Sequence, residues 1–212
     1  MRIDAAGLPF IALAAVPALL ALWFGRLPLA ASLVLFLLPL LIALFFRDPE
    51  RQAPAARDLV LAPADGRVMF AGPARADEAP PGAWLQVTIF LSVLDVHINR
   101  TPVAGRVTRV DHVPGKYLPA YRHDSHRNEH SEIWIDHDGQ SVVTRQVVGL
   151  LARRVVCRVR SGDALAPGAR IGLMKFGSRM DVFVPPTATL VVAAGESVRG
   201  GETVIARLSP PA

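Results

Sequence analysis

The stretch Trp84-Leu85-Gln86-Val87-Thr88-Ile89-Phe90-Leu91 has the composition of a β-strand, because β-branched and aromatic residues dominate it. Nine other short runs of this kind occur after residue 57, and Gly or Pro stands in almost every gap between them. No gap holds a convincing amphipathic helix. The ten runs are 68–71, 84–91, 106–110, 132–136, 141–148, 155–159, 170–174, 181–184, 190–193 and 203–208. The pattern predicts a mainly β domain, a sandwich or barrel.

Two apolar runs precede this domain. Leu8–Phe24 and 27–46 hold 17 and 20 uncharged residues, enough for roughly 26 and 30 Å of helix. They raise the hydrophobic fraction of the chain to 51% and its mean hydropathy to +0.34, above the values of an ordinary soluble domain. Prolines inside these runs are tolerated in membrane helices. We therefore expect an N-terminal α-helical membrane hairpin, either spanning or re-entrant.

The basic residues around the two runs predict their orientation. Arg47, Arg51 and Arg57 follow the second run, whereas Arg26 alone lies between the runs, so the positive-inside rule places the C-terminal domain in the cytoplasm. Arg2 and the first run also fit a signal peptide, but the second run would remain as an anchor. The expected location is the inner membrane, with the C-terminal domain on its cytoplasmic side.

The polar, proline-marked stretch 48–54 reads as a linker, which divides the chain into a hairpin unit of residues 1–57 and a β-rich domain of residues 58–212. The net charge of +5 divides into +2 and +3 over these parts. The basic residues are dispersed, which argues against nucleic acid and suits an anionic lipid surface. The single Cys157 excludes an intrachain disulfide and is expected in a buried strand.

Three segments carry the chemistry of the chain. They are Ala62-Pro63-Ala64-Asp65-Gly66, Leu91-Ser92-Val93-Leu94-Asp95-Val96-His97-Ile98-Asn99-Arg100 and Lys175-Phe176-Gly177-Ser178-Arg179, in this order. Together they resemble the phosphatidylserine decarboxylase proenzymes in their short form, and the resemblance extends over residues 59–208.

The resemblance implies a self-made cofactor. In that family the serine of the Gly-Ser pair attacks the preceding carbonyl, and the resulting ester eliminates to dehydroalanine, which takes up water and loses ammonia to become a pyruvoyl group. Carried onto this chain, cleavage between Gly177 and Ser178 would leave a β chain of residues 1–177 and an α chain of residues 178–212. A pyruvoyl group derived from Ser178 would form a Schiff base with the serine amine of phosphatidylserine and yield phosphatidylethanolamine. No site for pyridoxal phosphate is visible in the sequence.

Self-cleavage needs a base for the hydroxyl of Ser178, and histidine serves best near neutral pH. The resemblance supports His97 as this catalytic residue and Asp65 as the group that orients its ring, as in a Ser-His-Asp triad. An ordinary surface histidine and a simple Asp-Gly turn are the alternatives. The longer form of the family has a second histidine three positions after the first, where this chain has Arg100, so the identity of the maturation base stays open.

Four residues near these motifs are candidates for substrate binding. Arg100, Lys175 and Arg179 could hold the lipid phosphate or the leaving carboxylate through charge-assisted hydrogen bonds, and Asn99 stands beside Arg100. A solvated surface position is the alternative for each charged group.

The histidines at 123, 126 and 130 have a spacing that could bind zinc. However, Arg127-Asn128-Glu129 resembles a tract of the same family, with His130 where arginine is usual. We expect a substrate-facing loop and no metal.

Two other functions stay open from the residues. The same chemistry could act on another serine phospholipid, such as an archaetidylserine-type ether lipid. Alternatively, the stretches 162–168 and 195–202 resemble turns of barrel-sandwich hybrid carriers, and Met174-Lys175-Phe176 resembles a biotin attachment site, which would make the chain a membrane-anchored carrier. Homo-oligomerisation is also left open.

Overall fold

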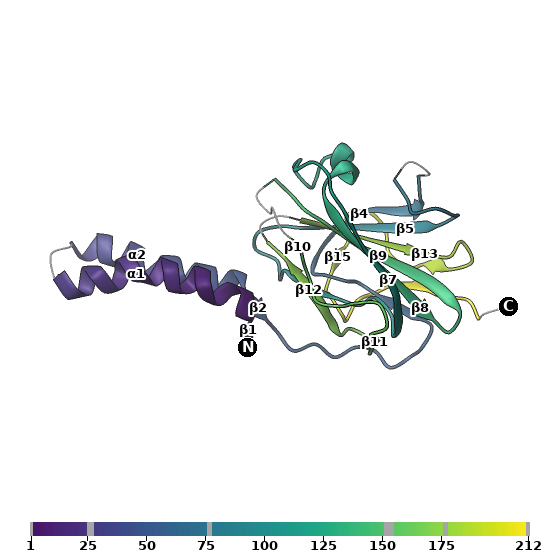
Figure 1. Ribbon diagram of the computed structural model, residues 1–212, viewed down its shortest axis with the longest axis horizontal. Helices are drawn as coiled ribbons and strands as arrows, with labels where there is room; N and C mark the ends of the chain where they lie inside the picture. The colour runs from purple at the N-terminus through teal and green to yellow at the C-terminus, as the bar shows by residue number, and fades with distance from the viewer. Residues whose placement is uncertain (1, 25–27, 76–77, 151–154, 176–177, 211–212) are drawn as a thin grey trace. The chain divides into compact units, whose positions relative to one another are not determined.

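The computed structural model describes residues 2–24, 28–75, 78–150, 155–175 and 178–210 (Figure 1). The chain forms two compact units, Met1–Glu50 and Arg51–Ala212. The boundary that the sequence suggests, at residue 57, lies in the stretch without helix or strand that follows Asp48.

The N-terminal unit contains two apolar helices, as the sequence predicts. Its elements are β1 (Arg2–Ile3), η1 (Ala5–Gly7), α1 (Leu8–Phe24), α2 (Leu29–Phe45) and β2 (Arg47–Asp48). The two short strands pair in antiparallel orientation, so the chain enters and leaves the hairpin side by side.

Close contacts join the beginning of α1 to the end of α2. Asp4 caps the first turn, since its Oδ1 accepts a hydrogen bond from the N–H of Ala6 at 2.9 Å. Gly7 lies against the ring of Phe46, where a β-carbon would clash, and Phe10 stacks on Phe46 with ring centroids 5.6 Å apart.

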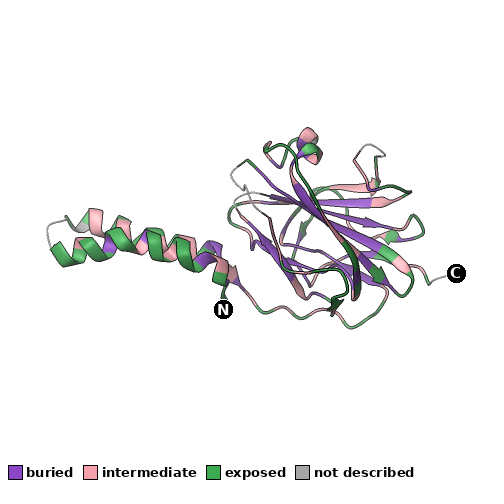
Figure 2. Ribbon diagram, in the orientation of Figure 1, coloured by how far each residue is buried: buried purple, intermediate pink, exposed green. Residues whose placement is uncertain are grey.

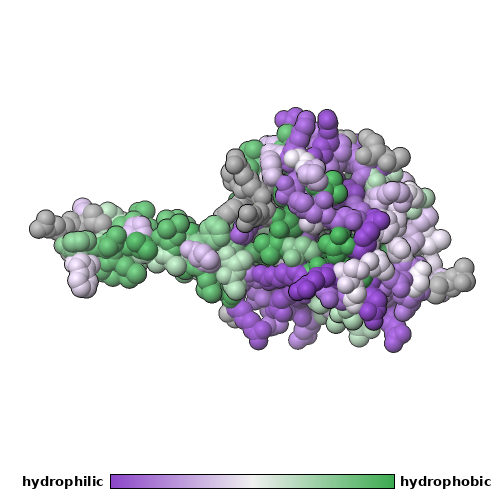
Figure 3. Space-filling view, in the orientation of Figure 1, coloured by the Kyte–Doolittle hydropathy of each residue, from purple (hydrophilic) through white to green (hydrophobic). Residues whose placement is uncertain are grey.

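The two helices are hydrophobic around their whole circumference, and Figure 3 shows apolar atoms along their length. Leu13 is 72% exposed and Trp23 is 85% exposed, which is typical of helices that face lipid. The helical segment Ala5–Phe24 is long and apolar enough to cross a membrane, and Ala30–Phe45 is a shorter apolar helix.

The C-terminal unit is mainly β and is built around one eight-stranded antiparallel sheet (Figure 1). In spatial order this sheet contains β11 (Ala164–Leu165), β7 (Gly105–Val113), β8 (His130–His137), β9 (Gln140–Val147), β13 (Ser178–Val184), β5 (Leu85–Leu91), β4 (Gly66–Pro73) and β15 (Ser197–Val198).

Two three-stranded sheets complete this unit. One has the order β10 (Val155–Cys157), β12 (Arg170–Met174) and β6 (Ile98–Arg100), and the other has the order β14 (Thr189–Leu190), β16 (Val204–Arg207) and β3 (Leu59–Leu61). A short 3₁₀ helix, η2 (His123–Arg127), precedes β8.

The hydrophobic core lies between the large sheet and the two small ones. Ile89 and Val182 point inward from neighbouring central strands of the large sheet, and they meet Ile171 of β12, Val60 of β3 and Ile205 of β16. All five side chains are buried, and Figure 2 shows that burial follows the strands. This arrangement confirms the predicted mainly β fold.

Two details differ from the predicted pattern. Strand β13 begins at Ser178 and not at residue 181. The apolar pattern did not reveal its first residues, because Ser178 and Arg179 are polar although both are buried. Cys157 lies at the end of a strand, as expected, but its side chain is half-buried, and burial raises the pKa of its thiol.

Gly105→Ala should destabilise the domain far more than Gly139→Ala. Both glycines have positive φ, 150° and 84°, but a β-carbon at Gly105 would clash with the carbonyl oxygen of Asp136, whereas Gly139 faces open space. We expect Gly139→Ala to lower the free energy of unfolding by about 1 kcal/mol and Gly105→Ala to lower it by about 1–3 kcal/mol more. Denaturant unfolding followed by tryptophan fluorescence measures both. Equal effects would contradict the strand geometry at Gly105.

Candidate active site

Ser178 is the first residue of β13 and pairs with Leu91 at the end of β5. Its side chain is fully buried, and its Oγ has no hydrogen-bond partner within the part of the chain that the structure describes. A buried hydroxyl without a partner is costly, which makes Ser178 a candidate for a functional position. The other half of the predicted cleavage site, Gly177, lies outside the described residues.

A small apolar cluster joins the three sequence motifs. Ala64, Leu91, Met174 and Met180 are buried together. Ala64 precedes Asp65, Leu91 pairs with Ser178, and Met174 donates its backbone N–H to the carbonyl of His97 at 3.2 Å. Segments more than a hundred residues apart in the sequence therefore meet at this point.

His97 is fully buried, and its ring orientation is defined by the backbone. Its Nδ1 lies 2.9 Å from the carbonyl oxygen of Asp95. A carbonyl can only accept a hydrogen bond, so Nδ1 of His97 carries a proton. The carboxylate of Asp95 in turn accepts hydrogen bonds from the N–H and the hydroxyl of Ser92 at 2.8 and 2.7 Å, which closes the turn before His97.

Asp65 is held between two other segments. Its Oδ1 accepts the backbone N–H of Gly200 and its Oδ2 accepts a hydrogen bond from Arg51, each at 2.8 Å. Arg51 also bonds Glu202 at 2.9 Å. These contacts tie the first residues of the C-terminal unit to the Asp65 turn, and the orienting role of Asp65 toward His97 stays a prediction.

Arg100 is buried beside the Asp65 segment. Its guanidinium donates to the carbonyl of Gly168 at 3.0 Å, and its backbone N–H donates to the carbonyl of Pro63 at 2.7 Å. Lys175 directly follows β12 and is half-buried. The binding roles of Arg100 and Lys175 toward substrate stay predictions.

The predicted binding residue Asn99 forms an amide pair with Gln146, which sequence reasoning missed, and the pair bridges two sheets. Gln146 of β9 donates from Nε2 to Oδ1 of Asn99 in β6 at 2.7 Å, and both side chains are fully buried. Asn99 Nδ2 and Gln146 Oε1 have no partner among the described residues. A polar residue at an inward strand position, opposite Met180, was the signal that could have identified Gln146.

The opposite face of β13 carries a buried charge network. The Nε of Arg179 donates to Oδ1 of Asp181 at 2.8 Å, Thr88 donates to the same oxygen at 2.8 Å, and Glu78 lies 3.7 Å from Arg179. Burial alone raises the pKa of Asp181, but Arg179 and Arg145 outweigh burial and hold this pKa below its ordinary value of 3.8. Burial alone lowers the pKa of Arg179, but Asp181 and Glu78 raise it above its ordinary value.

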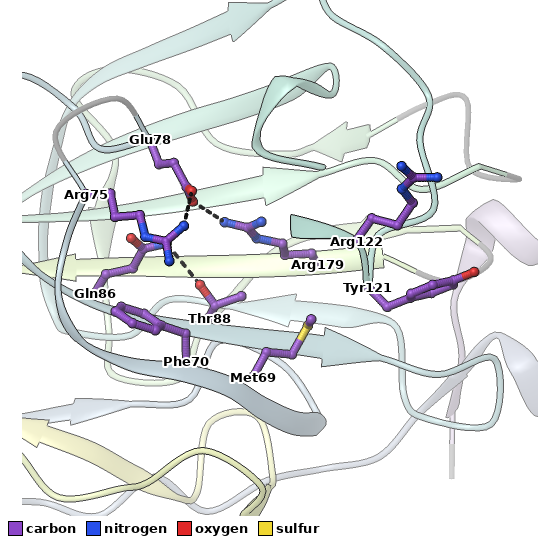
Figure 4. Close-up of a pocket in the computed structure, with 9 residues that line it drawn as sticks. All are labelled: Met69, Phe70, Arg75, Glu78, Gln86, Thr88, Tyr121, Arg122 and Arg179. Atoms are coloured by element: carbon purple, nitrogen blue, oxygen red, sulfur yellow. Dashed lines mark hydrogen bonds and ion pairs between the residues drawn. The ribbon is translucent and has the colours of Figure 1, made fainter. Parts of the chain in front are cut away.

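This network lines a pocket of about 220 Å³ on the outer face of the sheet. In Figure 4, Glu78 points between Arg75 and Arg179, while Tyr121 and Arg122 lie at the other side of the pocket. The lining holds three arginines, Arg75, Arg122 and Arg179, and one carboxylate, Glu78.

The predicted histidine loop is ordered by hydrogen bonds. His130 Nδ1 donates to the carbonyl of Asn128 at 2.8 Å, and burial lowers the pKa of His130 below its ordinary value of 6.5. His126 lies 3.7 Å from Glu78, and the side chain of His123 lies outside the described part. Within the described residues no group of three or more His, Cys, Asp or Glu side chains could hold a metal ion. The absence of metal stays a prediction.

The sequence also matches a known protein family. The family model for phosphatidylserine decarboxylase matches residues 38–206, which include every motif segment described above. The chain belongs to the phosphatidylserine decarboxylase family. Three similar proteins carry the name phosphatidylserine decarboxylase proenzyme.

The relative from Symbiobacterium thermophilum is 45% identical over 95% of this chain and 94% of its own length. The relative from Solibacter usitatus is 42% identical over 98% and 97%. The relative from Pelodictyon phaeoclathratiforme is 43% identical over 77% of each chain. As a member of the phosphatidylserine decarboxylase family the chain is an enzyme, and the carrier alternative is not needed.

Replacing Asp181 by Asn should lower the free energy of unfolding by about 3–5 kcal/mol, because it removes the nearer of the two carboxylates that neutralise the buried guanidinium of Arg179 and leaves only Glu78, at 3.7 Å. Asp111→Asn is the matched control: Asp111 pairs with Arg109 at 2.6 Å on the surface, and its loss should cost less than about 1 kcal/mol. Denaturant unfolding at pH 7 measures both. Similar costs would mean that the buried pair contributes no more than a surface pair.

The carboxylate of Asp181 should make the stability of the domain sensitive to acid. The pKa of Asp181 is depressed in the folded state, so its contribution is fully present above the unfolded pKa of about 3.9 and is lost as the pH falls through the folded pKa. The unfolding free energy of the parent should therefore fall more steeply below pH 4 than that of Asp181→Asn. Parallel pH curves would exclude an ionised Asp181.

Proposed function

We propose that this chain is a phosphatidylserine decarboxylase that cuts itself between Gly177 and Ser178 and converts phosphatidylserine to phosphatidylethanolamine with the resulting pyruvoyl group. The observation that carries the proposal is the Oγ of Ser178, which is buried without a hydrogen-bond partner among the described residues. It begins a strand beside the His97 segment. The pyruvoyl group would supply a ketone that binds the substrate amine and accepts the electrons released with CO₂.

In the cut, Ser178 Oγ attacks the carbonyl carbon of Gly177, the peptide C–N bond breaks and an ester forms. The hydroxyl proton must leave during the attack, and the new amine must gain a proton. His97 suits both transfers, because an imidazole can accept and return a proton near neutral pH, and the hydrogen bond of Nδ1 to the carbonyl of Asp95 orients the ring. Asp65 is proposed to support the charged ring.

The fold would keep the new α chain in place after the cut. Arg179 pairs with Phe90 of β5 on one side and with Val147 of β9 on the other. Farther along, β15 pairs with β4 and β16 pairs with β3. The chain end at Ser178 would therefore stay where it is generated, with residues 178–212 held by strands of the β chain.

We propose that the remaining motif residues bind substrate. Asn99 Nδ2 is a buried donor without a partner among the described residues, and it is suited to the substrate carboxylate or phosphate. Arg100 and Lys175 add positive charge beside the same segments. Arg179 already binds two carboxylates, so it would act chiefly by holding the strand that carries Ser178.

We propose that the N-terminal helices anchor the enzyme in the inner membrane, with the C-terminal unit in the cytoplasm. The length and composition of Ala5–Phe24 support insertion, and the excess of arginine after the second helix supports this orientation.

The headgroup chemistry is the same for an ether lipid with a serine headgroup. Assays with both lipids would distinguish them.

Ser178→Ala should give one uncut and inactive chain, because alanine has neither the attacking oxygen nor the leaving group for elimination. Ser197→Ala is the matched control, since Ser197 also begins a strand but is exposed. Denaturing gels and intact mass measure the cut, and CO₂ release from labelled phosphatidylserine measures activity. A Ser178→Ala chain that still splits before residue 178 would overturn the proposal.

His97→Ala should slow conversion of the precursor by about 10²-fold or more, the usual contribution of a general base. His137→Ala is the control. His137 also forms an Nδ1 hydrogen bond to a backbone carbonyl, that of Ala104 at 2.7 Å, but it is the last residue of β8 and belongs to none of the three motif segments. The time course of conversion is followed in freshly synthesised protein from pH 5 to 9. Equal rates in a folded His97→Ala chain and the parent would remove His97 from maturation.

A further inference from the structure

Large apolar side chains are exposed at the end of the β domain that carries Ser178. Leu94 is 80% exposed, Tyr121 is 63% exposed and Leu150 is 57% exposed, and Val93 and Tyr117 are also exposed. Exposed apolar side chains are unremarkable when scattered, but a group of them beside a functional site marks an interaction surface.

Strand registers place these residues at one end of the domain. Leu91 pairs with Ser178, so the following Val93 and Leu94 lie beyond the beginning of β13. Val147 pairs with Arg179, so Leu150 follows at the same end.

The loop of residues 114–129 lies there too, because β7 and β8 pair through Val113 and His130. Within it, the ring of Tyr121 meets the ring of Phe90 edge to face, with centroids 6.3 Å apart. Figure 1 shows η2, part of this loop, beyond the end of the large sheet where β8 begins.

The exposed charges in these loops are basic and favour an anionic partner. Lys116, Arg122 and Arg127 are exposed, whereas the three acidic residues Asp95, Asp124 and Glu129 are half-buried. Asp124 pairs with Arg122 at 3.1 Å, and the Oε2 of Glu129 accepts a hydrogen bond from the hydroxyl of Tyr117 at 2.6 Å. Basic side chains interleaved with tyrosine and leucine suit the headgroup region of a bilayer with anionic lipids.

We propose that the loops 92–96 and 114–129, with Leu150, form a membrane-docking surface that presses the Ser178 end of the domain onto an anionic bilayer. The inference rests on the proposed function, because a diacyl lipid must bring its headgroup to a buried Ser178. Docking by this end lets the headgroup enter from the membrane while the acyl chains stay in it. It adds a second contact to the one that the apolar helices make.

The test uses the full chain with Cys157 replaced by Ser, so that one introduced cysteine can carry an environment-sensitive fluorophore. Leu94→Cys and Tyr121→Cys report on the proposed surface. Thr187→Cys is the control, because Thr187 is exposed and follows the opposite end of β13. Each protein is reconstituted in vesicles of phosphatidylcholine and phosphatidylglycerol that contain nitroxide-labelled lipid.

We expect quenching at positions 94 and 121 to exceed that at 187 by about twofold or more, and to fall when phosphatidylglycerol is omitted. Absent or equal quenching would overturn the docking surface. So would cross-linking between copies through position 94, which would make this face a dimer interface.

An activity measurement separates this inference from the proposed function. The double variant Leu94→Asp, Tyr121→Asp should lose about tenfold more turnover on bilayer phosphatidylserine than on a dispersed short-chain substrate, since only the former needs docking. Equal losses would contradict docking. Quenching at position 94 without any decarboxylation by the parent would support docking and reject the proposed function.

Discussion

The pairing of β13 with strands on both of its sides is the constraint on which the site depends. Main-chain hydrogen bonds to β5 and β9 hold the strand from its first residues onward, so a serine at its beginning has one defined position. The alternation of the strand then sends Ser178 and Met180 to the inner face and Arg179 and Asp181 to the outer face. One ladder thus determines both the buried hydroxyl and the charge network behind it.

The two faces of β13 differ in what they contribute. On the inner face, buried polar atoms of Ser178, Asn99 and Gln146 lack partners among the described residues. On the outer face, Arg179 is bound by Asp181, Glu78 and Ser125. The ion pairs and hydrogen bonds fix the side chain of Arg179, although Oδ2 of Asp181 on the same face also lacks a partner among the described residues. Buried groups without partners are costly, and they are tolerated where a ligand, a reaction or water uses them.

The sequence predicts the elements whose pattern is local. The run 170–174 coincides with β12, and the two apolar runs coincide with helices because uncharged stretches of that length leave little choice. It does not predict the beginning of β13, because Arg179 and Asp181 look exposed until their partners from other strands are known. Strands β3 and β6 are three residues long and owe their geometry to sheet pairing, so they carry no periodic signal.

For the site, motif resemblance gave Ser178, His97, Asn99 and Arg100 as candidates, and the structure gathers their segments around one apolar cluster. The contact of Asp65 with Arg51 and Gly200 could not be read from the sequence, since these residues are 14 and 135 positions away. The same holds for Gln146, whose importance appears only when β6 lies opposite β9. Long-range pairing of polar side chains is the information that a local pattern lacks.

The C-terminal 35 residues supply strands to the large sheet and to the sheet that contains β3. If the chain is cut before Ser178, no covalent bond joins these strands to their partners any longer, and refolding changes from a unimolecular to a bimolecular reaction. The precursor could refold after denaturation as a single chain, but in the mature enzyme the β chain would have to bind an α chain again. The cut would therefore fix the result of a folding reaction that had already finished.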